Sequence, residues 1–406
     1  MRQIKRRWGN RSAVMLGLAL LAVPLVCLAV DAPAGFDNLT NGFTSQTQFD
    51  IDLAVFGEVE DDDEGLGPVY NAQACRECHQ NPVSGATSQV TELRVGRFDG
   101  FTFTDRPGGS LINDRAIHPD IQERVAGEDN VVDTRSSLNV LGDGFVEALP
   151  DTAFTNVQTA QPSGMKGQII RVPVLEAPGT TRIGRFGWKN QHASLLSFSA
   201  DAYLNEMGIT SPLQPTENTS NGRSVAAFDE VPDPEDAATA SAPFGPDVEA
   251  FARFMRSTTV PPRDTALAAT FDAQQGASLF NSIGCNICHT PSLTTAPSGT
   301  SFNGGKFIVN SALGSKTIRP FSDFMLHDVG TGDGIVQNGG QSTRNKLRTP
   351  PLWGFRTRAR FMHDLFNVTR NNAILRHTNE AEPVIQNYIN LSTTQKNQII
   401  TFLNSL

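Results

Sequence analysis

One short motif, present twice, constrains this chain more than any other feature. The pattern Cys-x-x-Cys-His occurs at residues 75–79 and again at residues 285–289. In this pattern two thiols can add to the vinyl groups of one porphyrin, and the histidine that follows can bind its iron. The motifs therefore predict two covalently attached haem c groups, with His79 and His289 as proximal iron ligands. The predicted attachment residues are Cys75, Cys78, Cys285 and Cys288.

A zinc site and a pair of disulfides are the alternatives to haem attachment. Paired Cys-x-x-Cys units can hold zinc, but zinc sites seldom place a histidine directly after both pairs or separate the pairs so widely. Two disulfides would contribute little to a chain of 406 residues. The cysteine outside the motifs is Cys27, so haem attachment accounts for all the others.

Residues 1–29 have the pattern of a secretory signal peptide. Basic residues come first, an apolar run from Ala13 to Val30 follows, and small residues stand at its end. We expect cleavage after Ala29, or as late as Ala34, and export to the periplasm. An uncleaved membrane anchor is the alternative, because the apolar run is nearly long enough to span a bilayer.

Length and composition limit the remaining classes. A chain of 406 residues exceeds what one hydrophobic core usually serves, so two packed units are expected. The 35 glycines and 24 prolines indicate many loops. The formal net charge of −9 repels polyanions, so no nucleic-acid partner is expected.

The order of patterns predicts a mainly α fold with two cytochrome c-like haem domains, long irregular loops and little strand. The N-terminal haem domain is expected over residues 35–265, including a long loop at 211–246, and the C-terminal cytochrome c domain over 266–406. Helices are expected over 247–256 and 272–284, and after a cap at Ser392. Residues 135–142 resemble residues 348–354, which suggests that one haem domain was duplicated.

Longer strings resemble a known family. They are GPVYNAQACRECH, RFGWKNQHASLLSF, NEMGIT, GCNICH, FSDFMLHDVG, LRTPPLWGF, FMHD and AILRHTNEAE, and they span residues 65–406. The chain resembles the bacterial di-haem cytochrome c peroxidase superfamily, and within it the di-haem oxidoreductase group. The resemblance implies that one haem transfers electrons while the other meets the substrate.

The resemblance also implies a different sixth ligand for each haem. His363 matches a family histidine, and the position of the family's axial methionine after it is His377 here. This predicts His289/His377 ligation of the C-terminal haem, with His327 as the alternative ligand. For the N-terminal haem, the family's displaceable histidine corresponds to Val95, so an open sixth position is expected.

Glu206 matches the family's catalytic glutamate in its Glu-Met-Gly setting, which implies an acid/base role in splitting an O–O bond. The alternative is an exposed residue at a helix end. The family's glutamine partner corresponds to Phe198, so Gln191 and His192 are candidates for that role. Glu147 is a second carboxylate candidate.

Three further residues are candidates for roles at the haems: Trp188 by the resemblance, and Arg135 and Arg348 because each begins one of the repeated strings. Trp188 corresponds to the tryptophan between the haems, although a buried indole is also common in cores. Arg135 and Arg348 are candidates for pairing with haem propionates, because a guanidinium fits a carboxylate, and surface ion pairs are the alternative.

The sequence therefore predicts an exported, peroxidase-like di-haem c-type oxidoreductase. Electrons are expected to pass from the C-terminal haem to an open N-terminal haem, which reduces hydrogen peroxide or oxidises another substrate. The expected partners are a small soluble donor, a cytochrome c or a cupredoxin, and a second copy of the chain in a homodimer. The resemblance also implies Ca²⁺, without a diagnostic ligand string. The alternative is a non-catalytic di-haem cytochrome for electron transfer or sensing.

Overall fold

The computed structural model describes residues 29–406. Except for Ala29, the predicted signal peptide lies outside the described residues. Within them, no helix is both long enough and apolar enough to cross a membrane.

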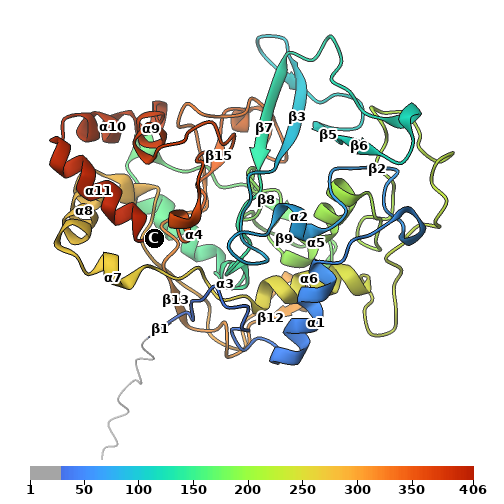
Figure 1. The fold of residues 1–406 in the computed structure, drawn as a ribbon, viewed down its shortest axis with the longest axis horizontal. Helices are drawn as coiled ribbons and strands as arrows, with labels where there is room; N and C mark the ends of the chain where they lie inside the picture. Colours follow the sequence, from blue (N-terminus) through green and yellow to red (C-terminus); the bar gives the residue numbers. More distant parts are fainter. Residues whose placement is uncertain (1–28) are drawn as a thin grey trace, which may run out of the picture.

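The α-helices of the described chain are short and separated by long loops (Figure 1). They are α1 (Gln46–Phe56), α2 (Cys75–Cys78), α3 (Asp143–Glu147), α4 (Asp151–Ala160), α5 (Leu195–Ala202), α6 (Pro246–Ser257), α7 (Thr265–Ala268), α8 (Phe271–Ser282), α9 (Arg370–Leu375), α10 (Glu382–Ile389) and α11 (Thr393–Asn404). Two further turns carry site residues: the π-helix η4 (Tyr203–Met207) and the 3-10 helix η5 (Cys285–Ile287).

The strands are shorter still, and most form two-stranded pairs. They are β1 (Val30–Asp31), β2 (Val69–Tyr70), β3 (Thr91–Phe98), β4 (Phe103–Thr104), β5 (Leu111–Ile112), β6 (Arg115–Ala116), β7 (Val131–Ser136), β8 (Arg171–Pro173), β9 (Thr181–Ile183), β10 (Leu293–Thr294), β11 (Ser301–Phe302), β12 (Phe307–Ile308), β13 (Lys316–Ile318), β14 (Leu326–His327) and β15 (Leu347–Arg348). Helix accounts for 32% of the described residues and strand for 15%, so helix exceeds strand and more than half of the described chain is loop, as expected for a chain with long irregular loops.

The predicted helices are confirmed, and their ends follow local chemistry. The Ser392 side chain accepts from the backbone N–H of Gln395, and the Gln395 side chain accepts in return from the backbone N–H of Ser392, so a capping box begins α11. Pro246 begins α6, as suits a residue without an N–H. The predicted loop at 211–246 contains no α-helix or named strand before Pro246.

One antiparallel sheet was not predicted. Strand β3 pairs with β7 along six residues, with Glu92 opposite Arg135, and it also pairs with β4 and β5. The sheet stands above α2 and α5 in the view of Figure 1. Residues of β3 and the first cysteine motif line one cavity.

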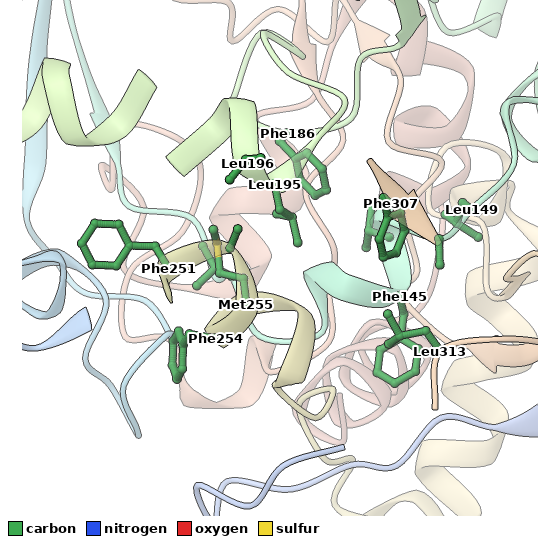
Figure 2. Close-up of a cluster of buried hydrophobic side chains, with 14 of the residues drawn as sticks. Phe145, Leu149, Phe186, Leu195, Leu196, Phe251, Phe254, Met255, Phe307 and Leu313 are labelled. Carbon is green, nitrogen blue, oxygen red and sulfur yellow. The ribbon is translucent and has the colours of Figure 1, made fainter. Parts of the chain in front are cut away.

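The main hydrophobic core contains residues from both halves of the chain. Phe307 and Leu313 pack beside Phe145 and Leu149, as Figure 2 shows. Strand β1 also pairs in parallel with β13. The core therefore does not divide at residue 265, where the sequence suggested a domain boundary.

A smaller core holds the C-terminal helices together. Phe280 and Ile283 of the α8 region pack against Ile399 and Phe402 of α11, and the second cysteine motif lies against this cluster. Gly276 allows the close approach, since a Cβ atom there would lie 1.9 Å from the carbonyl oxygen of Gln398.

Candidate haem-binding cavities and active site

Helix α2 presents the first cysteine motif to a cavity of about 820 Å³, a size that suits a cofactor. The backbone N–H of His79 donates to the carbonyl oxygen of Cys75 at 3.1 Å, so the histidine follows directly on the helical turn. Burial raises the pKa of Cys75 and of Cys78 to about 12, which keeps both thiols protonated at neutral pH.

His79 is suited to bind a metal through a neutral imidazole. Burial lowers its pKa to about 4, so the ring keeps a lone pair at neutral pH. Its Nδ1 atom is buried and has no hydrogen-bond partner among residues 29–406. Of the described residues that line this cavity, His79 is the only histidine.

The second cysteine motif lines another cavity, together with two imidazoles that have the same arrangement. His289 donates from Nδ1 to the carbonyl oxygen of Phe321 (3.0 Å), and His377, just after α9, donates from Nδ1 to that of Ala373 (2.9 Å). Each Nε2 therefore remains available as a ligand. Burial lowers the pKa of both rings, that of His289 to about 4. The structure thus brings the predicted ligand pair to one cavity.

His327 lines the same cavity, but both of its ring nitrogens are engaged. Nδ1 lies 2.7 Å from a Glu380 oxygen and Nε2 lies 2.9 Å from an Asp323 oxygen. Burial alone would lower the pKa of His327, but these carboxylates outweigh it and raise the pKa to about 12. A doubly paired imidazolium has no lone pair for iron, which corrects the expectation that His327 could be a ligand.

Trp188 lines both cavities. Its indole N–H donates to the carbonyl oxygen of Ser136 (2.8 Å), and its own carbonyl oxygen accepts from the backbone N–H of Arg348 (2.8 Å). The ring also meets the edge of His363, with centroids 6.1 Å apart. These contacts hold the indole between the two candidate haem sites.

Glu206 lies on the wall of the first cavity, within the π-helical turn η4. Such turns are uncommon and often mark functional sites. Asn71 donates to Glu206 Oε2 at 2.9 Å. Gly208 ends the turn with φ of 75°, and a Cβ there would lie 2.6 Å from the Gly67 carbonyl oxygen, so glycine is required. Burial, followed by the charge of Glu92, raises the pKa of Glu206 to about 8.

Two residues of β3 complete this wall and were not predicted. Arg94 binds both oxygens of Glu92, with distances of 2.7 and 2.9 Å. Burial alone would raise the pKa of Glu92, but Arg94 outweighs it and lowers the pKa. Glu92 lies near Glu206 on this wall, so its negative charge helps to raise the pKa of Glu206. The available signal was the string Glu-Leu-Arg soon after the first motif, but nothing in it indicates a cavity.

Two predicted catalytic residues lie outside both cavity walls. Glu147 binds Arg256 through both oxygens (2.7 and 2.9 Å) and accepts from Leu195 and Asn303, so it is a buried structural anion. This corrects its assignment as a catalytic carboxylate. His192 stands behind the wall, where its Nε2 lies 3.0 Å from Asp201.

Arg135 and Arg348 were expected to pair with haem propionates, and the structure differs from this expectation at Arg135. Arg135 binds Asp333 at 2.7 Å through Nε and Gln337 at 2.8 Å through Nη1, so its guanidinium is already neutralised. Arg348 and the unpredicted Arg358 line the second cavity with no salt-bridge partner among the described residues, and burial lowers the pKa of each to about 10. Two such buried cations suit the propionates of a haem.

Two further predictions concern the open sixth position of the N-terminal haem and a bound calcium ion. Val95 is fully buried in β3, away from the cavity wall, and His118 stacks on Phe228 outside it. Three clusters of possible metal-binding side chains occur in the described chain: Cys288, Asp323 and His327; Asp133, His363 and Asp364; and Glu217, Asp229, Asp233 and Glu235. The calcium ion stays a prediction.

Taken together, the residues fit two haem groups. Each cavity has a Cys-x-x-Cys pair and a neutral histidine, and the second adds buried, unneutralised guanidiniums.

Comparison with known proteins finds one family whose model matches this chain. Residues 112–406 match the model of the family described as "Di-haem oxidoreductase, putative peroxidase". This match begins after the first cysteine motif and after Glu92 and Arg94. No curated protein matches the chain.

Solved structures offer only distant likenesses. Hydrazine synthase from Kuenenia stuttgartiensis is 14% identical, with a TM-score of 0.44 and coverage of 98% of this chain and 100% of that one. A MauG-like protein associated with microbial copper homeostasis is 15% identical (TM-score 0.42, 94% of each chain). The diheme peroxidase BthA from Burkholderia thailandensis is 13% identical (TM-score 0.41, 93% of this chain and 94% of that one).

The family match covers most of the chain, and the family implies two haem cofactors and a redox function. The chain therefore belongs to the di-haem oxidoreductase family.

Proposed function

We propose that this chain is a periplasmic di-haem c-type peroxidase that reduces hydrogen peroxide with electrons from a small soluble donor protein. The observation that carries this proposal is the difference between the two cavities. The C-terminal cavity has two imidazoles with free Nε2 atoms. Among the residues that the structure describes, His79 is the only histidine that lines the N-terminal cavity, which also holds the carboxyl of Glu206.

The difference supports a division of labour. A haem with two protein ligands is suited to electron transfer, and one with an open position can meet a substrate. Bound there, haem iron would supply electrons for breaking the O–O bond. The overall reaction consumes one peroxide, two electrons and two protons and gives two water molecules.

The chain's own residues supply the other requirements. Glu206 can move protons on the wall of the N-terminal cavity. Trp188 touches both cavities and supports a path for electrons from the C-terminal side. The donor is a cytochrome c or a cupredoxin in this proposal, and the haems are covalently attached through the four cysteines.

The test mixes the oxidised di-haem protein with hydrogen peroxide and follows its optical spectrum. Wild type should react rapidly, and Glu206→Gln should react at least tenfold more slowly with both haems retained. Glu176→Gln, a buried carboxyl change outside both cavities, is the matched control and should react like wild type. A wild-type protein that does not react would contradict peroxidase function and favour a non-catalytic electron-transfer or sensing cytochrome.

A further inference from the structure

We infer that Glu92 and Glu206 act as a pair of carboxyls that shares one proton, so that one donates a proton to the substrate while the other accepts one. This inference rests on the proposed function and adds a second residue to its acid/base chemistry. Both residues lie on the wall of the N-terminal cavity, although they come from distant elements, β3 and η4.

The first support is geometric. Glu92 and Glu206 lie on the same cavity wall, close enough to share a hydrogen bond, which a carboxyl can donate only when it is protonated. Two buried carboxylates in contact cannot both remain ionised without a large electrostatic cost. The pair therefore holds a single proton at neutral pH.

The second support is that the surroundings decide which carboxyl is ionised. Glu92 receives a bidentate contact from Arg94, and it faces Arg135 across the β3–β7 ladder, with the closest atoms 3.9 Å apart. Glu206 receives only the neutral amide of Asn71. The negative charge consequently stays on Glu92, and the proton stays on Glu206.

Other charged and titratable groups around the pair do not change this order. They are Arg94 on β3, Arg135 on β7, Cys78 on α2, Asp201 on α5 and the loop residue Asp105. Asp201 is itself paired with His192 at 3.0 Å, which reduces its influence on the carboxyl pair.

The pair can act without a change in its proton count. As the O–O bond of hydrogen peroxide breaks, its two electrons leave with one oxygen, and Glu206 protonates that oxygen so that it departs as water. Glu92 takes the proton from the other oxygen. Two electrons from the donor protein and two protons from solvent convert the oxygen that remains into the second water, and the proton on Glu92 returns to Glu206 along their hydrogen bond.

The test is a pH titration by infrared difference spectroscopy on the oxidised di-haem protein. A protonated carboxylic acid has a characteristic carbonyl stretching band. The band that disappears in Glu206→Gln reports the shared proton. In Glu92→Gln, Glu206 loses its anionic neighbour and gains Arg94, so the midpoint of this band should fall by about one pH unit or more. In Arg94→Gln, the midpoint should rise, because a cation is lost.

Glu176→Gln is the control, since it removes a buried carboxyl outside the cavity and should leave the midpoint unchanged. An unchanged midpoint in both Glu92→Gln and Arg94→Gln would overturn the inference. If Glu206→Gln reacts slowly with peroxide but the band midpoint in Glu92→Gln equals that of wild type, the proposed function stands and the inference of a shared proton is wrong. If wild type ignores peroxide, the proposed function fails, and the infrared titration still judges the pair.

Discussion

Replacing Asp333 by alanine tests the buried charge cluster that joins the two halves of the chain. One Asp333 oxygen lies 2.7 Å from Arg135 Nε, and the other lies 2.8 Å from Lys189 Nζ. All three side chains are at most 1% exposed. Lys189 adjoins Trp188, and Arg135 lies on β7, so this cluster supports the wall between the cavities.

Asp333→Ala leaves two buried cations without their anion. Breaking a buried pair by removing one partner costs about 3–5 kcal/mol, and two cations depend on this carboxylate, so we expect a loss in the upper part of that range. The free energy of unfolding is measured by urea denaturation of the di-haem protein, followed by circular dichroism. Glu128→Ala removes an exposed partner of Arg97 and should cost less than about 1 kcal/mol.

The pH dependence of the free energy of unfolding provides a second test of the same cluster. Burial lowers the pKa of Lys189 from 10.5 to about 8, so between these values the unfolded chain binds more protons than the folded one. The contribution of Lys189 to stability therefore rises as pH increases from about 8 to 10.5. Asp333 raises the folded pKa of Lys189, so this pKa falls below 8 in Asp333→Ala. Asp333→Ala should therefore recover part of its loss relative to Glu128→Ala as pH rises from that lower value to about 8, with no further recovery up to pH 10.5. A loss within about 1 kcal/mol at neutral pH would refute the reasoning.

Two other substitutions separate structure from chemistry. Gly276→Ala places a Cβ 1.9 Å from the Gln398 carbonyl oxygen, so the helices α8 and α11 must separate. The free energy of unfolding should fall by about 1–3 kcal/mol. Gly164→Ala has open space and should change stability by less than about 0.5 kcal/mol; equal effects would contradict the packing argument. Glu147→Gln should cost about 3–5 kcal/mol in urea denaturation by weakening the Arg256 pair, with the haem spectra unchanged. A stable variant with altered spectra would restore a role for Glu147 at the haem.

The features that were predicted correctly are those that depend on residues close together in the sequence. The cysteine motifs, the capping box at Ser392 and the loop before Pro246 depend on neighbouring residues, and each could be recognised from a short string. The positions of His377 and Glu206 came from the resemblance, and both line the cavities expected for them.

Long-range contacts account for the differences. Strand β3 carries a strand signal, because Leu93 and Val95 alternate with Glu92 and Arg94. The string does not show that its polar face lines a cavity, where Glu92 and Arg94 pair with each other. His327 offers the same imidazole as any ligand, and only the folded chain reveals that Asp323 and Glu380 occupy both of its nitrogens. The core that crosses residue 265 likewise depends on packing between distant segments.

The most direct test of the central claim is the electron paramagnetic resonance spectrum of the fully oxidised protein. A closed C-terminal haem and an open N-terminal one predict one low-spin and one high-spin ferric signal. His377→Gly should abolish the low-spin signal, whereas His118→Gly, which lies outside both cavities, should not. Two low-spin signals that hydrogen peroxide leaves unchanged would contradict the account.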